Sequence, residues 1–101
     1  MVFLNEIEIH CLNSVCDDFE NANHIQESVV EAIGRRVPDV EIISALRNLA
    51  NQKLLDVYTF DKYTQKFLKI NQWIESRIHQ VWFFINSDGR KVLDVNWKGE
   101  D

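Results

Sequence analysis

The spacing of apolar residues changes once along the chain, and that change sets the fold class. Up to about residue 52, apolar side chains recur at steps of three and four, which is the period of an amphipathic α-helix. Beyond it, two runs rich in β-branched and aromatic residues, 55–60 and 81–85, favour strands. The pattern predicts a mainly helical α+β fold. A chain of 101 residues has the size of one domain, 1–101.

Three helices are predicted in the first half. The first spans 4–19, and the second begins at a capping box formed by Asn23 and Gln26 and ends at Gly34, a left-handed cap. The third covers about 38–52, because proline suits the first turn of a helix. Its inner face is predicted to hold Ile42 or Ile43, Leu46, Leu49 and Ala50, and its outer face Glu41, Ser44, Ala45, Asn48 and Gln52.

The second half is predicted to contain two strands that pair as an antiparallel ribbon. Apolar residues between them again step by three and four, which predicts a helix over about 65–78. These residues are Phe67, Ile70, Ile74 and Ile78. Residues 87–97 fit either a short helix capped by Ser87 or a hairpin that turns at Asp88-Gly89, and the helix is favoured.

The predicted order of helix, helix, helix, strand, insertion, strand and short helix resembles the winged helix-turn-helix family. Two segments carry the likeness: DVEIISALRNLANQKLLDVYTF (39–60) resembles a third helix that runs into the first wing strand, and HQVWFFINSDGRKVLD (79–94) the second wing strand and a capped helix. The resemblance implies a three-helix winged helix-turn-helix core, a two-stranded antiparallel wing carrying a helical insertion, and a short C-terminal helix. The insertion departs from the family pattern, in which the wing is a short loop.

The resemblance also implies a function. In winged helix proteins that bind DNA, the third helix enters the major groove and the wing touches the backbone. The chain is therefore expected to be a DNA-binding, transcription-regulator-like module with double-stranded DNA as partner. The residues expected to approach bases are Ser44, Ala45, Asn48 and Gln52. Those expected near phosphates are Arg35, Arg36, Arg47, Lys53, Lys62 and Lys66.

The distribution of charge permits DNA binding, although the formal net charge is −5. Residues 1–34 hold seven acids and no Lys or Arg, whereas residues 35–98 hold all eleven Lys and Arg together with seven acids. The predicted third helix and wing therefore lie in the basic part of the chain. Asp39 and Glu41, at the start of that helix, weigh against DNA because they repel phosphate.

The aromatic residues favour an alternative, a winged helix that serves protein–protein contact or dimerisation without DNA. Eight of the eleven aromatic residues lie between 58 and 84. Tyr63 and Trp73 are the interface candidates, and a homodimer is the expected assembly. The other interpretation is an aromatic-rich core around the strands, which accounts for Trp82, Phe84 and Phe60 without any partner.

No catalytic, cofactor or metal site is predicted, and the chain is not expected to be an enzyme. Cys11 and Cys16 do not have the spacing of a metal or redox motif, so both are expected to be free thiols. The three histidines lie on separate predicted elements: His10, His24 and His79. The start of the chain lacks the features of an export signal and no segment has the length of a membrane span, so we expect a cytoplasmic protein.

Overall fold

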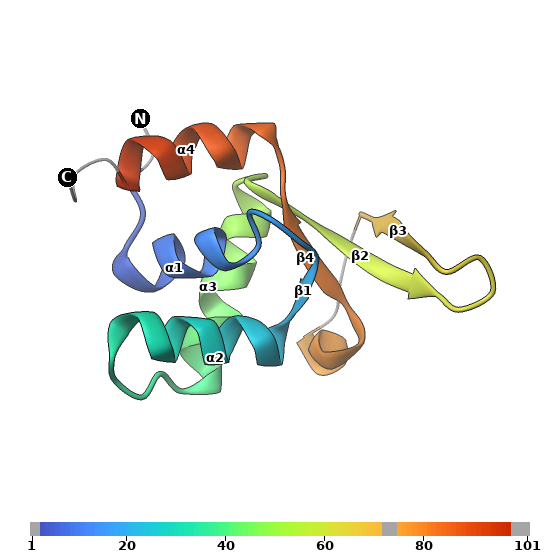
Figure 1. Ribbon diagram of the computed structural model, residues 1–101, viewed down its shortest axis with the longest axis horizontal. Coiled ribbons are helices and arrows are strands. Elements are labelled where there is room, and N and C mark those ends of the chain that lie inside the picture. The colour runs from blue at the N-terminus through green and yellow to red at the C-terminus, as the bar shows by residue number, and fades with distance from the viewer. Residues whose placement is uncertain (1–2, 72–74, 98–101) are drawn as a thin grey trace.

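The chain forms an α+β fold in which helices pack against an antiparallel sheet, and one β-hairpin of that sheet extends away from the helices (Figure 1). The computed structural model describes residues 3–71 and 75–97. Within these ranges the helices are α1 (Glu6–Ser14), α2 (Ala22–Ile33), α3 (Asp39–Asn51), the 3-10 helix η1 (Glu75–Gln80) and α4 (Ser87–Trp97), and the strands are β1 (Glu20–Asn21), β2 (Leu55–Asp61), β3 (Lys66–Ile70) and β4 (Trp82–Ile85). A membrane span would need a longer and more apolar helix than any in the described residues.

The sheet contains more than the predicted two-stranded ribbon. The predicted pairing of the two strand runs is confirmed, because β2 and β4 are antiparallel neighbours with Leu55 opposite Ile85 and Tyr58 opposite Trp82. Two further strands extend this ribbon, since β1 pairs with β4 and β3 pairs with β2. The described sheet therefore has four strands in the order β1-β4-β2-β3, all antiparallel.

The predicted helix over 65–78 is wrong. Its first part is the strand β3, and its last part belongs to the separate 3-10 helix η1. Along β3, the side chains of Phe67 and Lys69 lie on one face of the sheet and that of Leu68 lies on the other. The strand pairs its backbone with the edge of β2 that β4 leaves open. The apolar steps of three and four thus run across two elements that do not share a helical face.

The core lies between the sheet and the helices α1, α2 and α3. Among the residues whose burial is described, Phe83 on β4 is the largest side chain that is completely buried, and the stripe of Ile42, Leu46 and Leu49 on α3 is buried with it. Ala45 was predicted on the outer face of this helix, but it is only 4% exposed. The prediction fails because α1 packs along that side of α3 and widens its buried face.

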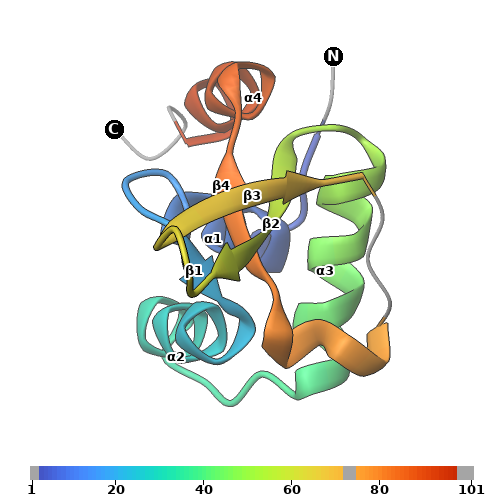
Figure 2. The same cartoon turned by 90° about the vertical axis from the view of Figure 1, so that its right-hand side faces the viewer.

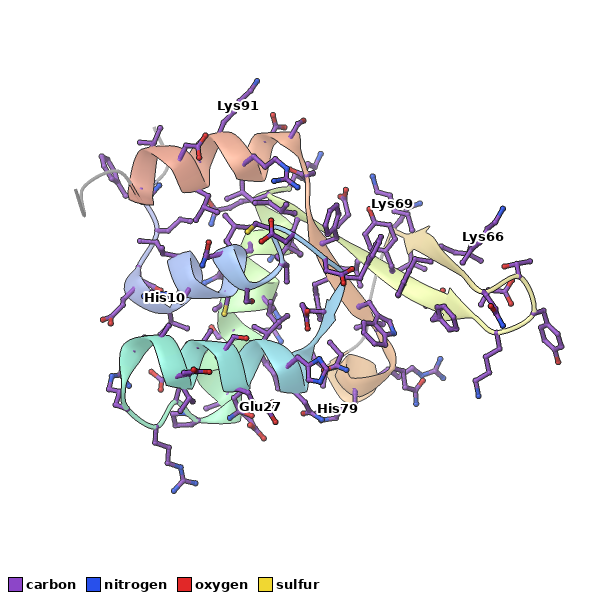
Figure 3. The ribbon with its side chains drawn as sticks, viewed as in Figure 1. His10, Glu27, Lys66, Lys69, His79 and Lys91 are labelled. Atoms are coloured by element: carbon purple, nitrogen blue, oxygen red, sulfur yellow. The ribbon has the colours of Figure 1, made fainter. Side chains whose placement is uncertain are left out.

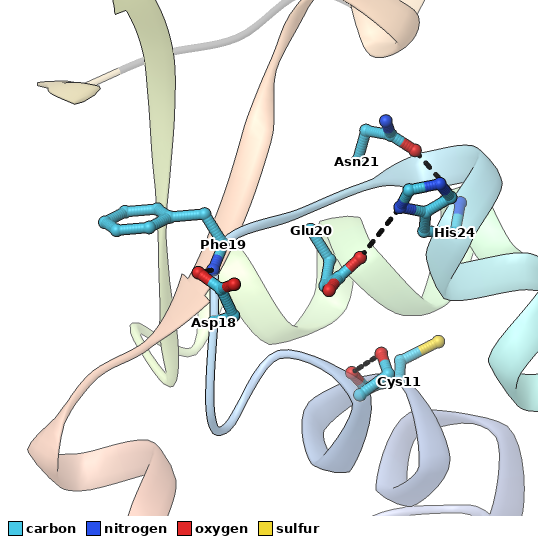
Figure 4. Close-up of polar contacts among 7 residues, drawn as sticks. Cys11, Asp18, Phe19, Glu20, Asn21 and His24 are labelled. Carbon is cyan, nitrogen blue, oxygen red and sulfur yellow. Dashed lines mark hydrogen bonds and ion pairs between the residues drawn. The ribbon is translucent and has the colours of Figure 1, made fainter. Parts of the chain in front are cut away.

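Local hydrogen bonds set where the first helices begin and end. Helix α2 starts at Asn21, whose Oδ1 accepts the His24 backbone N–H at 2.9 Å (Figure 4), so the predicted capping box at Asn23 is wrong. A capping box is formed at the start of α1 instead, between Asn5 and Glu8. The predicted left-handed cap at Gly34 is confirmed, with a φ of 78°.

The favoured helix at residues 87–97 is confirmed as α4, although Ser87 does not cap it. Asn86 Oδ1 accepts the Gly89 N–H at 2.8 Å and is the capping group. The same asparagine donates from its backbone N–H to the Leu54 carbonyl at 3.3 Å and from Nδ2 to the Lys53 carbonyl at 2.8 Å. These bonds attach the start of α4 to the connection between α3 and β2.

Candidate functional site

The solvent-facing side of α3 carries a continuous exposed stripe. Its residues, which recur at steps of four, three and four and lie opposite the buried stripe, are Val40, Ser44, Arg47 and Asn51. Ser44, one of the residues predicted to approach bases, lies near the middle of this stripe. These four side chains are exposed, so the stripe is the side of α3 that the other described elements leave uncovered.

Of the other residues predicted to approach bases, Ala45 is buried, whereas Asn48 and Gln52 lie at the margins of this stripe. Asn48 faces α1, and its Nδ2 donates to Glu8 Oε2 at 3.3 Å. That carboxylate belongs to a residue that is only 7% exposed, and its Oε1 also accepts the Asn5 backbone N–H. Gln52 is exposed just beyond the end of α3. Asn48 therefore already has a partner within the domain.

A groove of about 720 Å³ opens beside the C-terminal half of α3. It lies between this helix, the strands β2 and β3, and the start of α4. The residues that line it are Arg47, Ala50, Asn51, Lys53, Leu55, Asp56, Val57, Lys69, Ile70, Asn71, Asn86, Ser87 and Asp88. Arg47 and Asn51 belong to both the exposed stripe and the groove, so the two form one surface.

Three cationic side chains from three different segments line the groove: Arg47, Lys53 and Lys69. The lining also holds Asp56 and Asp88, which leaves a formal excess of one positive charge. Asp56 Oδ1 lies 3.5 Å from Lys69 Nζ. The groove is mildly basic and its lining mixes polar and apolar side chains, so an anionic partner that also accepts hydrogen bonds suits its polar part.

The remaining residues predicted near phosphates fall into two groups. Arg35 and Arg36 lie in the loop between α2 and α3, and Lys62 and Lys66 lie at the tip of the β2–β3 hairpin. All four are exposed. The loop and the tip lie toward opposite ends of the longest axis, which extends over 44 Å, with α3 between them (Figure 1).

Six aromatic side chains of the described residues gather on the sheet face turned away from the core, which we name the aromatic face. They are Phe19, Tyr58, Phe60, Phe67, Trp82 and Phe84. Phe19 is central, because its ring stacks on Phe67 at 4.1 Å and on Phe84 at 4.8 Å between centroids. Its backbone N–H donates to Asp18 Oδ1 at 2.8 Å just before β1 (Figure 4).

The predicted aromatic core is therefore wrong in its members. Phe83 is the ring that enters the core, whereas Trp82 and Phe84 point to the aromatic face, because neighbouring side chains on a strand alternate between faces. Phe60, on the same face as Trp82, is 42% exposed. Burial among these rings, followed by the nearby Asp56 carboxylate, raises the pKa of Tyr58.

The tip of the β2–β3 hairpin presents further apolar surface. Tyr63, one of the two interface candidates, is 99% exposed. Asp61 holds the turn by accepting the Tyr63 N–H and the Thr64 hydroxyl. Leu68 on β3 is 49% exposed. The second interface candidate, Trp73, lies outside the described residues.

The described residues do not gather three or more histidine, cysteine or acidic side chains in a way that could hold a metal ion. Both cysteines are free thiols. Cys11 is completely buried, and this burial, together with the nearby Glu8, raises its pKa to about 12. Burial also raises the pKa of Cys16, which is partly exposed.

Asn51 and Lys69 are among the residues of this surface that sequence reasoning missed. Asn51 lies seven residues after Ser44, so the helical period would have placed it on the same stripe. Lys69 carried no such signal, because its place in the groove depends on β3 being a strand. Comparison of the chain with protein-family models, with curated proteins and with solved structures finds no match.

Proposed function

We propose that this chain is a winged helix module that binds double-stranded DNA through α3. The element order supports this proposal, because α1, β1, α2, α3 and β2 follow one another and the last strand, β4, inserts between β1 and β2. Three helices and a small antiparallel sheet with this connection are the parts expected of a winged helix. The strand β3 and the helix η1 are additions to that pattern.

The observation that carries the proposal is the continuity of the exposed stripe with the basic groove. An α-helix fits the major groove, where arginine reads guanine and asparagine reads adenine through paired hydrogen bonds. Arg47 and Asn51 are exposed on the side of α3 that a duplex reaches. Lys53 and Lys69 flank them in the groove, where they suit phosphate oxygens.

The charges on α3 indicate which half of the helix faces DNA. Asp39 and Glu41 in its first turn are exposed and repel phosphate. The cationic groove lies beside the C-terminal half instead. The duplex is therefore expected to approach Ser44, Arg47 and Asn51. Lys62 and Lys66 on the hairpin are then expected beside the DNA backbone farther along the duplex.

Fluorescence anisotropy with a labelled duplex tests the proposal at low and at moderate salt. We expect binding that weakens steeply with salt, because phosphate contacts release counterions. Arg47→Ala is expected to weaken binding about tenfold. It should also reduce, by about one, the steepness with which the logarithm of the binding constant falls with the logarithm of salt concentration. Lys91→Ala is the matched control, since Lys91 is exposed and points outward from α4 (Figure 3).

Two results contradict the proposal. The first is the absence of binding even at about 50 mM salt, where electrostatic attraction to DNA is strong. The second is an equal loss of affinity for the Arg47 and Lys91 variants, which would indicate a general charge effect. Asn51→Ala tests whether Asn51 reads bases or contacts the DNA backbone. Loss of a base-reading residue alters sequence preference, whereas loss of a backbone contact weakens binding to all sequences alike.

Contact with another protein is the second candidate function, and the projecting hairpin favours it. Phe60, Tyr63 and Leu68 expose apolar surface on this hairpin, on an element that extends away from the core. Sedimentation velocity distinguishes the two functions when it is combined with the DNA titration. A chain that self-associates but shows no salt-dependent DNA binding supports contact without DNA.

A further inference from the structure

We infer that two copies of this chain associate edge to edge along β3, as antiparallel strands with Leu68 opposite Leu68 of the second copy. The inference does not require DNA binding. It deepens the second candidate function by specifying both the partner and the register.

The strand β3 is an open edge of the sheet. Among the described strands it pairs with β2 alone, so its other side presents backbone N–H and C=O groups without a strand partner. Figure 2, which looks along the longest axis, shows β3 as the strand nearest the viewer. This edge is therefore available to a strand of a second copy.

Both faces of the hairpin leave apolar side chains for a partner to cover. Phe60, 42% exposed, lies on the aromatic face, whereas Leu68, 49% exposed, lies on the opposite face. An added strand at the β3 edge approaches both faces at once, because its own side chains alternate above and below the sheet. Covering Leu68, which is on the edge strand itself, on both copies provides a hydrophobic contribution to association.

The sequence of β3 complements itself in one register. With Leu68 opposite its own copy, all five residues of the strand pair, and Phe67 lies opposite Lys69 of the second copy. A lysine beside an aromatic ring is a favourable cation–π pair. A register centred on Phe67 or Lys69 shortens the overlap, and the register centred on Lys69 also places two lysines opposite each other.

Lysines on an edge strand normally prevent such pairing, because their charges repel an approaching copy. Carboxylates near the two lysines of β3 reduce this repulsion. Lys69 Nζ lies 3.5 Å from Asp56 Oδ1 of the same chain. Lys66 lies opposite Asp61 in the β2–β3 ladder. Each edge lysine thus has a carboxylate of its own chain nearby, which reduces the repulsion between two copies.

The resulting dimer has a two-fold axis at Leu68 and one continuous sheet through both copies. The two aromatic faces then lie on the same side of that sheet, because opposite residues on paired strands share a face.

Sedimentation from low to high micromolar concentration tests the association. The unchanged chain is expected to dimerise, and Leu68→Lys is expected to weaken the dimer at least tenfold because it sets two ammonium groups opposite each other. The fold should persist, since Leu68 is half exposed and outside the core. Val95→Lys is the matched control, because Val95 is 51% exposed on α4, away from the hairpin.

Cysteine cross-linking tests the register, in a chain that also carries Cys16→Ser. Leu68→Cys is expected to form a disulfide between copies, because residues directly opposite on antiparallel strands have Cα atoms about 4.5–5.5 Å apart. Thr64→Cys is exposed at the hairpin tip, and this register separates it widely from its copy, so it should remain reduced.

Three outcomes overturn the inference: a monomer at every concentration, equal weakening by the Leu68→Lys and Val95→Lys variants, or cross-linking of Thr64→Cys as readily as Leu68→Cys. The DNA titration keeps the proposals distinguishable. A monomer that binds DNA with a steep salt dependence overturns this inference alone.

Discussion

Gly89→Ala is expected to destabilise the domain, although alanine is the better helix former. Gly89 lies in the first turn of α4, and this turn packs directly against the backbone of Leu54. A Cβ atom at this position would overlap the Leu54 carbonyl oxygen and lie 2.8 Å from Ile85 Cγ1. The first of these atoms is backbone, so a side-chain rotation cannot relieve the overlap.

The magnitude follows from three contributions. Replacing glycine by alanine in an open helix stabilises it by about 1 kcal/mol. Overfilling a packed contact costs about 1–3 kcal/mol. Moving α4 outward also stretches the hydrogen bond from the Asn86 N–H to the Leu54 carbonyl, 3.3 Å in the structure, which contributes about 1 kcal/mol. The expected net loss is about 2 kcal/mol, or a fall in Tm of roughly 10 °C.

Urea and thermal unfolding followed by circular dichroism measure this loss. The control is Asp94→Ala, a change to alanine at an exposed position of the same helix, which is expected to alter stability by less than about 0.5 kcal/mol. An unchanged or raised Tm for Gly89→Ala refutes the reasoning, because it would mean that α4 does not lie against the Leu54 backbone.

Three further changes test other parts of the fold by urea unfolding. Asn5→Ala removes the α1 capping box and is expected to cost about 1 kcal/mol, whereas the same change at exposed Asn23 should have little effect. Phe19→Ala removes the central ring of the aromatic face and should cost about 2–4 kcal/mol, against a negligible effect of Phe3→Ala at 79% exposure. Stability should fall by up to about 1.4 kcal/mol per pH unit above pH 9, because the Cys11 thiol ionises there in the unfolded chain but has a pKa of about 12 when folded. Cys11→Ala should flatten this decline, and an unchanged slope contradicts the assignment.

The helical half of the fold was largely predictable from local features. The steps of three and four placed α2 and α3 in the right segments, and Gly34 ended α2 because glycine adopts a positive φ without a steric penalty. The exact starts were less predictable. Asn21 and Asn23 are equally good caps by residue type, and the helix starts after Asn21 because residues Glu20 and Asn21 pair with β4.

The candidate site was predictable only in part. Ser44 was identified from its helical position and Arg47 from the resemblance to winged helix proteins, and both lie on the exposed stripe. Asn48 was expected to approach bases on the same grounds, but the buried carboxylate of Glu8 on α1 accepts its amide hydrogen bond. Spacing within one helix cannot indicate which flank a second helix will cover.

The sequence by itself determined the fold class, the segments that become helices, and the pairing of the two apolar strand runs. These depend on hydrophobic period and turn residues, which act over a few positions. Only the tertiary structure decided that residues 66–70 form a strand, that Phe83 rather than its neighbours enters the core, and that Lys69 joins Arg47 in one groove. The physical reason is that each of these outcomes depends on contacts between segments far apart in the sequence. The ladder between β2 and β3 pairs five residues with five others, although the local spacing of residues 66–70 also suits a helix.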